Sequence, residues 1–325
     1  MKNNNRVSAF SLIEISVVIL IIGILIAGVT QASRLLNQAK LSSAKTMTQS
    51  SPVSSIRNLS LWVDSTSDAS FQSSDLDDGT SITTWNDINP QTVTKADLAP
   101  SSATGILLKT NMINGLPAVL VNADTSTTYS LSSANFSNIS TASTVFAVVK
   151  LPSALSRETI LSKRTIGSYT ASSSINLQLS TTTTPGAAWS YCDGTTQITT
   201  ASTCPYVSSV TSAAASTNYV LSVVYNASSD LIGSSAAGGI SFFQNGAESG
   251  QVSTITPKVA PVNVTDPLVI GKPNTSLPAP AASHYFHGYI GEIIIFDRAL
   301  KKEERQSIEA YLGKKWGIAM TTATY

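Results

Sequence analysis

The segment Phe10-Ser11-Leu12-Ile13-Glu14, followed by the run from Ile15 to Val29, decides the fold of the N-terminal part of the chain. The run is mostly Ile, Val and Leu, and no charged residue occurs between Ile15 and Ser33. Its length matches the roughly 20 apolar residues that a helix needs to cross a bilayer. Glu14 stands at the entrance to this run. An ionisable group at such a position is costly, which indicates a functional role.

Three interpretations of this segment compete. In a cleaved secretory signal peptide, Lys2 and Arg6 form the charged region before the apolar core. A carboxylate at the head of that core, and helix-compatible sequence that continues to Met47, argue against it. In a plain membrane anchor, the same two cations hold the N-terminus in the cytoplasm. The third interpretation, which we favour, depends on the order of the residues around Glu14.

The stretch Ala9-Phe10-Ser11-Leu12-Ile13-Glu14 resembles the N-terminal segment of type IV pilins and type II secretion pseudopilins: a small residue, then Phe-Thr-Leu-Ile-Glu, then an apolar helix. The resemblance implies that prepilin peptidase cuts between Ala9 and Phe10 and methylates the new amine of Phe10. Methylation keeps the positive charge. Because a carboxylate in hydrocarbon needs a partner, we expect Glu14 to pair with the Phe10 amine of a neighbouring subunit.

Composition limits the remaining possibilities. The 325-residue chain has a net charge of +1, which gives no electrostatic reason to expect a nucleic-acid partner. Charged residues make up only 12%, while Ser and Thr are abundant, as in many exported β-proteins. We divide the chain into a leader at 1–9, a membrane and assembly helix at 10–50, a linker at 51–57, a head at 58–318 and a tail at 319–325.

Beyond the linker the periodicity changes from helical to alternating, with short runs of Val, Ile, Phe and Tyr between polar turns. Asn245-Gly246 is a strong hairpin signal. This pattern favours a β-sandwich or barrel. The predicted strands are Leu59–Val63, Ala118–Val121, Thr144–Lys150, Thr159–Lys163, Ser174–Leu179, Tyr219–Tyr225, Ile240–Gln244, Leu268–Ile270 and Gly288–Phe296.

One helical pattern follows the last predicted strand, from Lys302 to Trp316. One of its faces carries Ile308, Tyr311, Leu312 and Lys315. Acidic residues in its first turn and lysines in its last turn complement the helix dipole. We expect an amphipathic helix packed on the sandwich.

A second resemblance covers nearly all of residues 58–318. The order of several motifs is similar to that of bacterial concanavalin A-like (laminin G-like) jelly-roll domains. The resemblance implies a mainly β fold, in which a long hydrophobic N-terminal helix precedes a jelly-roll β-sandwich with a C-terminal amphipathic helix. The motifs include Leu59-Ser-Leu-Trp-Val-Asp64, Thr84-Trp-Asn-Asp87, Asn114-Gly-Leu-Pro-Ala-Val119 and Phe286-His-Gly-Tyr-Ile-Gly-Glu-Ile-Ile-Ile-Phe-Asp-Arg-Ala-Leu300.

Domains of this family bind carbohydrate, adhere to proteins or hydrolyse glycans. Glycosidases of this fold place carboxylates at alternate positions of one strand. Here the position two residues after Glu292 is Ile294. Glu158 and Glu248 are the other glutamates between residues 58 and 300, and none of the three pairs with another carboxylate at a spacing useful for hydrolysis. We therefore expect no enzymatic activity.

The remaining candidate sites have ordinary structural alternatives. Trp189, Tyr191 and Tyr206 are candidates for stacking on sugar rings, although packing of their own loop explains them slightly better. Asp75 and Asp77 lie in a segment with some features of a calcium loop, where a solvated turn is the simpler interpretation. No other cofactor is expected.

Cys192 and Cys204 are the only cysteines. In an exported chain they are expected to form one disulfide, with two free thiols as the alternative.

Together these features predict a minor pilin-like filament subunit with a lectin-like head for adhesion to a glycan or surface protein. A structural pilin or a secretion pseudopilin without a ligand is the alternative, and glycan hydrolysis a remote one. We expect the chain in the inner membrane, with the head outside the cytoplasm, and then in a periplasmic or cell-surface filament. The expected partners are prepilin peptidase, other pilin or pseudopilin subunits, and the head's ligand.

Overall fold

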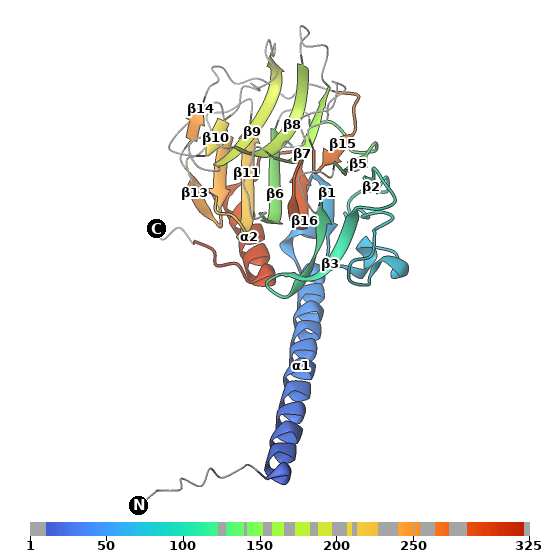
Figure 1. The fold of residues 1–325 in the computed structure, drawn as a ribbon. Coiled ribbons are helices and arrows are strands. Elements are labelled where there is room, and N and C mark those ends of the chain that lie inside the picture. The colour runs from blue at the N-terminus through green and yellow to red at the C-terminus, as the bar shows by residue number, and fades with distance from the viewer. Residues whose placement is uncertain are drawn as a thin grey trace, which may run out of the picture.

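The structure is a computed structural model of the whole chain, and Figure 1 shows one long helix that enters a β-rich head. The residues that it describes are 11–122, 128–139, 142–151, 158–165, 173–182, 188–196, 207–209, 213–226, 240–249, 251–253, 264–272 and 285–321.

Helix α1 runs from Leu12 to Gln49 and has 38 residues, or a length of about 57 Å at 1.5 Å per residue. Its side chains are exposed up to Leu36, and the head begins to cover the helix at Asn37. The chain then turns through a short 3-10 helix, η1, at Pro52–Ser55, because proline at the first position starts a helix well but cannot continue one. The helix therefore projects from the head for most of its length (Figure 1).

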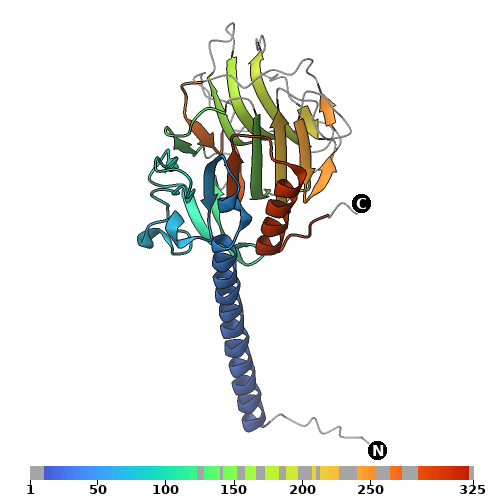
Figure 2. The same ribbon diagram turned by 180° about the vertical axis from the view of Figure 1, so that it is seen from behind.

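The head contains two antiparallel sheets (Figures 1 and 2). The first has the order β13-β12-β11-β6-β16-β4-β3, with β1 also paired to β16, and the second has the order β14-β10-β9-β8-β7-β15-β5-β2. The first sheet is formed by β1 (Leu59–Asp64), β3 (Ile106–Ile113), β4 (Leu116–Val121), β6 (Ala142–Lys150), β11 (Asn218–Asn226), β12 (Ile240–Gln244), β13 (Ala247–Ser249) and β16 (Gly288–Phe296). The second sheet is formed by β2 (Ala99–Pro100), β5 (Leu131–Ser133), β7 (Thr159–Thr165), β8 (Ser173–Thr182), β9 (Ala188–Thr196), β10 (Val207–Ser209), β14 (Gln251–Ser253) and β15 (Leu268–Ile270).

The first sheet is buried on both faces. On β6, Val145, Ala147 and Val149 belong to the core between the two sheets, whereas Phe146 and Val148 belong to a second core on the outer face. This follows from the alternation of side chains along a strand. It also explains why β6 and β16 are continuous apolar runs rather than alternating ones.

The second core is closed by helix α2, by η1 and by the last turns of α1 (Figure 2). Helix α2 spans Lys302–Trp316, as the sequence predicted, and ends at Gly317, which has the left-handed conformation that glycine adopts at helix ends. At its start the carboxylate of Glu304 accepts the N–H of Lys301. The predicted fold class is confirmed, and the expected Asn245-Gly246 turn joins β12 to β13.

Candidate functional site

The N-terminal end of α1 has a capping box. The Ser11 hydroxyl accepts the Ile13 N–H at 3.3 Å, and Glu14 Oε2 accepts the Ser11 N–H at 2.8 Å. Glu14 is exposed and turned back toward the end of the chain at which the predicted cleavage would create an amine. The cleavage residues Ala9 and Phe10 lie outside the described residues.

The surface of α1 beyond this cap is apolar. An 18-residue window of the helix has a mean hydropathy of 2.9, and none of it is buried by the head. Each large apolar side chain from Leu12 to Leu36 has an exposed fraction of at least 47%. A continuous apolar surface of this size requires lipid or other helices around it. The first two-thirds of α1 are thus long and apolar enough to cross a membrane.

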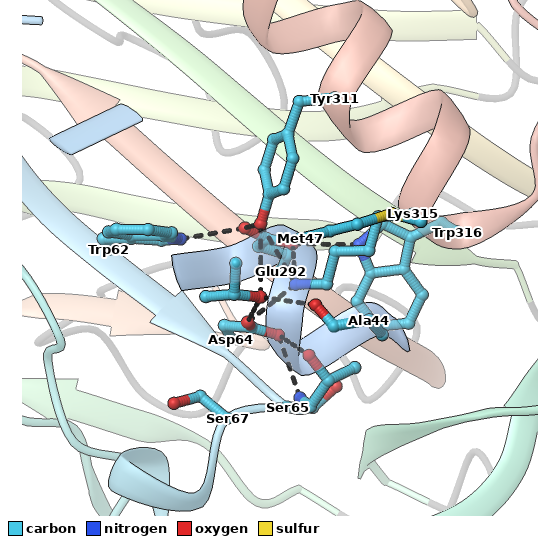
Figure 3. Close-up of polar contacts among 12 residues, drawn as sticks. Ala44, Met47, Trp62, Asp64, Ser65, Ser67, Glu292, Tyr311, Lys315 and Trp316 are labelled. Atoms are coloured by element: carbon cyan, nitrogen blue, oxygen red, sulfur yellow. Dashed lines mark hydrogen bonds and ion pairs between the residues drawn. The ribbon is translucent and has the colours of Figure 1, made fainter. Parts of the chain in front are cut away.

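The other end of α1 meets a buried cluster of polar side chains, which Figure 3 shows. Its charged members are Asp64 at the end of β1, Glu292 in β16 and Lys315 in the last turn of α2. The two carboxylate residues are directly opposite each other in the antiparallel pair β1–β16. The side chains of Lys315 and Asp64 have an exposed fraction of 0%, as has that of Glu292.

Glu292 accepts four hydrogen bonds. Its Oε1 accepts from Trp62 Nε1 at 2.8 Å and from the Tyr311 hydroxyl at 2.9 Å, while its Oε2 accepts from Lys315 Nζ at 2.7 Å and from Trp316 Nε1 at 2.9 Å. Each oxygen therefore has two donors. This arrangement suits a carboxylate and leaves no acceptor for an acid proton.

Asp64 also accepts four hydrogen bonds, two at each carboxylate oxygen. Its Oδ1 accepts from the backbone N–H and the hydroxyl of Thr66, at 2.9 and 2.8 Å. Its Oδ2 accepts from Lys315 Nζ at 2.6 Å and from the Thr48 hydroxyl at 2.8 Å. Thr48 belongs to the last turn of α1, so Asp64 connects the long helix to the head (Figure 3).

Burial away from solvent shifts the pKa values of the groups in the cluster. Burial raises the pKa of Glu292, and the ammonium of Lys315 opposes this effect. Burial also raises the pKa of Tyr311 well above its ordinary value, and the nearby negative charges of Glu292 and Asp64 add to the shift. Two carboxylates around one ammonium, without contact with solvent, have no access to a glycan. The cluster therefore has a structural role: its hydrogen bonds and ion pairs join α1, β1, β16 and α2.

A local irregularity in β16 places Glu292 in this cluster. The pairing of β16 with β6 shifts register between Ile290 and Glu292, so that Gly291 is an extra residue and the following side chains change face. A Cβ atom on Gly291 would lie 2.6 Å from Cη2 of Trp316. Glycine is required at this position because the indole packs directly on the strand backbone.

The sequence comparison found no carboxylate at a useful spacing from Glu292, but the structure places Asp64 directly opposite it. The comparison of positions within one strand missed Asp64, which lies on the adjacent strand, about 230 residues away in the sequence. One signal was present. Lys315 falls on the same face of α2 as Ile308, Tyr311 and Leu312, and a lysine on a buried face implies a buried anionic partner.

The predicted calcium residues are separate from this cluster. Asp75 is buried, and its carboxylate accepts hydrogen bonds from the backbone N–H and hydroxyl of Thr83 and from the hydroxyl of Ser74. Burial raises the pKa of Asp75, but these hydrogen bonds outweigh it and the net shift is downward. A calcium ion would have to replace these donors. The side chain of Asp77 is exposed.

The predicted ligand-binding aromatics belong to the second sheet or lie outside the described residues. The backbones of Trp189, Tyr191 and Cys192 are in β9, where Tyr191 pairs with Val207 of β10 and with Leu179 of β8. Their side chains, and the whole of Cys204 and Tyr206, lie outside what the structure describes. The stacking role of the aromatics and the disulfide stay predictions.

Two family models match the chain. Residues 122–304, more than half of the chain, match the concanavalin A-like lectin/glucanases superfamily, and residues 4–30 match the prokaryotic N-terminal methylation motif. No curated protein matches the chain.

Several solved structures are similar to it. A Trypanosoma rangeli sialidase in complex with 2,3-difluorosialic acid is 12% identical, with a TM-score of 0.43 over 82% of this chain and 34% of the sialidase. The binding domain of Paraclostridial Mosquitocidal Protein 1 is 10% identical, with a TM-score of 0.46 over 79% of this chain and 52% of that domain. Domain 4 of the Geobacillus stearothermophilus arabinanase AbnA, in complex with arabinotriose, is 12% identical, with a TM-score of 0.42 over 78% of this chain and 97% of that domain.

This chain thus spans about a third of the sialidase and half of the mosquitocidal binding domain. The observed sandwich agrees with the matched family model, and the apolar helix agrees with the matched methylation motif. The chain therefore belongs to the concanavalin A-like lectin/glucanase superfamily, and its methylation motif makes it a pilin-like subunit.

Proposed function

We propose that this protein is a minor filament subunit whose α1 polymerises and whose head binds a glycan or surface protein. The observation that carries the proposal is the division of α1. Its first two-thirds present only exposed, mostly apolar side chains, while its last turns are built into a lectin-like head. A head of this size suits a tip or low-copy position, because bulky heads crowd a continuous shaft.

Assembly in this proposal depends on Glu14. The capping box holds its carboxylate at the N-terminal end of the helix through Oε2. Once prepilin peptidase has exposed the Phe10 amine, the amine of a neighbouring subunit provides the cationic partner that a carboxylate in lipid requires. Lys2 and Arg6 place the leader in the cytoplasm by the positive-inside rule, so the head lies on the opposite side of the membrane.

We propose binding rather than catalysis for the head. Among the residues that the structure describes, the carboxylates that face each other across strands are Asp64 and Glu292, and both are buried and paired with Lys315 of α2. Retaining glycosidases need two carboxyl groups open to the substrate. We therefore assign ligand recognition to the second sheet, whose strand β9, between β10 and β8, carries Trp189 and Tyr191.

A glycan array probed with the full-length protein in detergent tests the proposal. Saturable binding that is lost in Trp189→Ala or Tyr191→Ala, but kept in the exposed-residue control Val93→Ala, supports a glycan-binding head. Absence of binding to any glycan or surface extract favours a structural pilin or pseudopilin. Release of sugar from any arrayed glycan contradicts the proposal that the head is not an enzyme.

Two additions to this experiment test the other predicted features. Repeating the array with calcium and with a chelator tests Asp75 and Asp77, since a calcium-dependent signal that Asp77→Asn abolishes assigns them to a metal site. Mass spectrometry of the protein from membranes tests processing. We expect a chain that begins at Phe10 and carries one added methyl group, and a chain that still contains Ala9 contradicts cleavage at this position.

A further inference from the structure

We propose that the buried polar cluster is a joint that holds α1 at one fixed angle to the head, with Thr48, Asp64 and Lys315 as its positioning residues. The inference goes beyond the proposed function, because it concerns how the helix is attached and requires neither a ligand nor a filament. Three observations carry it: the composition of the interface, the direction of its bonds, and the length of the helix outside it.

The interface between α1 and the head is small. The buried residues of α1 are Ala44 and Thr48, which approach the second core beside α2 and β1. Apolar contacts such as those of Ala44 are not directional and tolerate some rotation of the helix. Apolar packing by so few residues therefore restricts the direction of the helix only weakly.

The polar contacts at the periphery of this interface are weak. Lys45 pairs with Asp68 at 2.6 Å, but the exposed fractions of their side chains are 32% and 68%, and such surface pairs stabilise little. Lys40 Nζ donates to the Asn114 carbonyl at 3.3 Å on the surface of the β3–β4 turn. The bond from the Thr48 hydroxyl to Asp64 differs from both because it is buried.

The bonds beneath Thr48 make that contact rigid. Asp64 Oδ2, which accepts from Thr48, also accepts from Lys315 Nζ, and the same Nζ donates to Glu292. All three charged groups are therefore held from several directions by different elements. Burying such a group of ions seldom adds stability over apolar packing, and its best-attested benefit is a unique geometry.

The length of the exposed helix makes this geometry consequential. Glu14 lies about 50 Å from Thr48 along the helix. A tilt of about 10° at the joint would displace Glu14 by about 9 Å, which is several times the length of a hydrogen bond. A fixed angle thus determines where the assembly end of each subunit lies relative to its head. This last consequence rests on the proposed function, whereas the joint itself does not.

Distance measurements on the full-length protein in detergent micelles test the joint. Ketone-bearing amino acids introduced at Ser33, exposed on α1, and at Val93, which is 98% exposed on the head, accept spin labels without involving the cysteines. Double electron–electron resonance then reports the distribution of the distance between helix and head. The variant is Thr48→Val, which keeps the volume and removes the hydroxyl.

We expect the distribution in Thr48→Val to be at least twice as wide as in the parent protein. Thr48→Ser, which keeps the hydroxyl, should restore the narrow distribution, and Thr46→Val, an exposed threonine on the same turn, should leave it unchanged. Thermal unfolding of the head checks that each variant is folded. A distribution in folded Thr48→Val as narrow as that of the parent overturns the proposal, as does equal broadening in Thr46→Val.

Discussion

A glutamate lies at each end of α1: Glu14 in its first turn, and Glu292 of β16 in the buried cluster that its last turn meets. The two carboxylates differ in exposure and in the number of their hydrogen-bond donors. Glu14 is exposed at the free end, where its Oε2 accepts the Ser11 N–H of its own helix. Glu292 is 1% exposed at the joined end, and four donors from two elements, β1 and α2, surround it. The first is left available for a group outside the subunit, and the second is completely satisfied inside it.

The difference shows how one helix serves two purposes. A carboxylate that recognises a neighbouring subunit has to remain accessible. The fold therefore provides few hydrogen-bond donors for it, and its cationic partner comes from the neighbouring subunit. A carboxylate that must hold the fold together needs all its hydrogen bonds within the chain, because an incompletely satisfied buried ion is strongly destabilising. Substitutions at the two ends should therefore affect different properties of the protein.

The largest effect is expected for Lys315→Met. The substitution leaves Asp64 and Glu292 opposite each other without a cation, and removing one partner from a buried ion group lowers the free energy of unfolding by about 3–5 kcal/mol. Urea unfolding of the full-length protein, followed by tryptophan fluorescence, measures this. Lys314→Met is the matched control because Lys314 is exposed. A loss equal to that of the control contradicts the role of Lys315.

Glu14→Gln should reduce filament assembly and leave the stability of the head unchanged. In the proposed assembly Glu14 pairs with a neighbouring subunit and not with the head, so we expect incorporation into filaments to fall at least tenfold, or by about 1.4 kcal/mol in the free energy of subunit association. The urea midpoint of the head should not change. Quantitative immunoblotting of sheared filaments measures incorporation, with Ser16→Ala, a substitution of an exposed residue two positions further along the helix, as the control. Normal incorporation of Glu14→Gln would refute the pairing with the Phe10 amine.

Gly291→Ala should destabilise the joined end specifically. The new Cβ would lie 2.6 Å from the Trp316 ring, and overpacking of this kind lowers the free energy of unfolding by about 1–3 kcal/mol. Gly28→Ala is the matched substitution in α1, where no atom outside the adjoining helix backbone lies within 4 Å of the added methyl group. It should leave the unfolding of the head unchanged. Equal urea midpoints for the two variants would show that Trp316 moves away without strain.

The smallest effect is expected at the start of α2 and depends on pH. Hydrogen bonds from Arg298, supported by the Lys301 N–H, lower the pKa of Glu304 below its ordinary value of 4.5. A carboxylate with a lowered pKa in the folded state stabilises the protein above pH 4.5, and this contribution is lost as the pH falls through the folded pKa.

Glu304→Gln should therefore lower the free energy of unfolding by about 0.5–1 kcal/mol at neutral pH and by progressively less in acid. Urea unfolding at a series of pH values measures the difference, with the exposed neighbour Glu303→Gln as the control. A difference that stays constant, or grows as the pH falls, contradicts the sign derived from the lowered pKa.

Much of the fold was predictable because it depends on patterns between near neighbours in the chain. The absence of charge from Ile15 to Ser33 predicts the apolar helix, and the spacing of Ile308, Tyr311 and Leu312 predicts α2 with its observed ends. Short runs rich in Val, Ile, Phe and Tyr predicted β6, β11 and β16, but β3 and β9 were not predicted, because polar residues interrupt them. The weak strands of the second sheet depend on pairing with distant segments, which local patterns do not report.

The sequence by itself determined that this chain has a pilin-like helix, a lectin-like sandwich and a closing helix, since apolar periodicity and residue order are local properties. Only the tertiary structure decided that Thr48, Asp64, Glu292 and Lys315 meet. Their meeting requires the antiparallel register of β1 with β16, the extra residue at Gly291 and the docking of α2 over both. These are long-range relations that depend on how distant strands align, and no spacing within one segment encodes them.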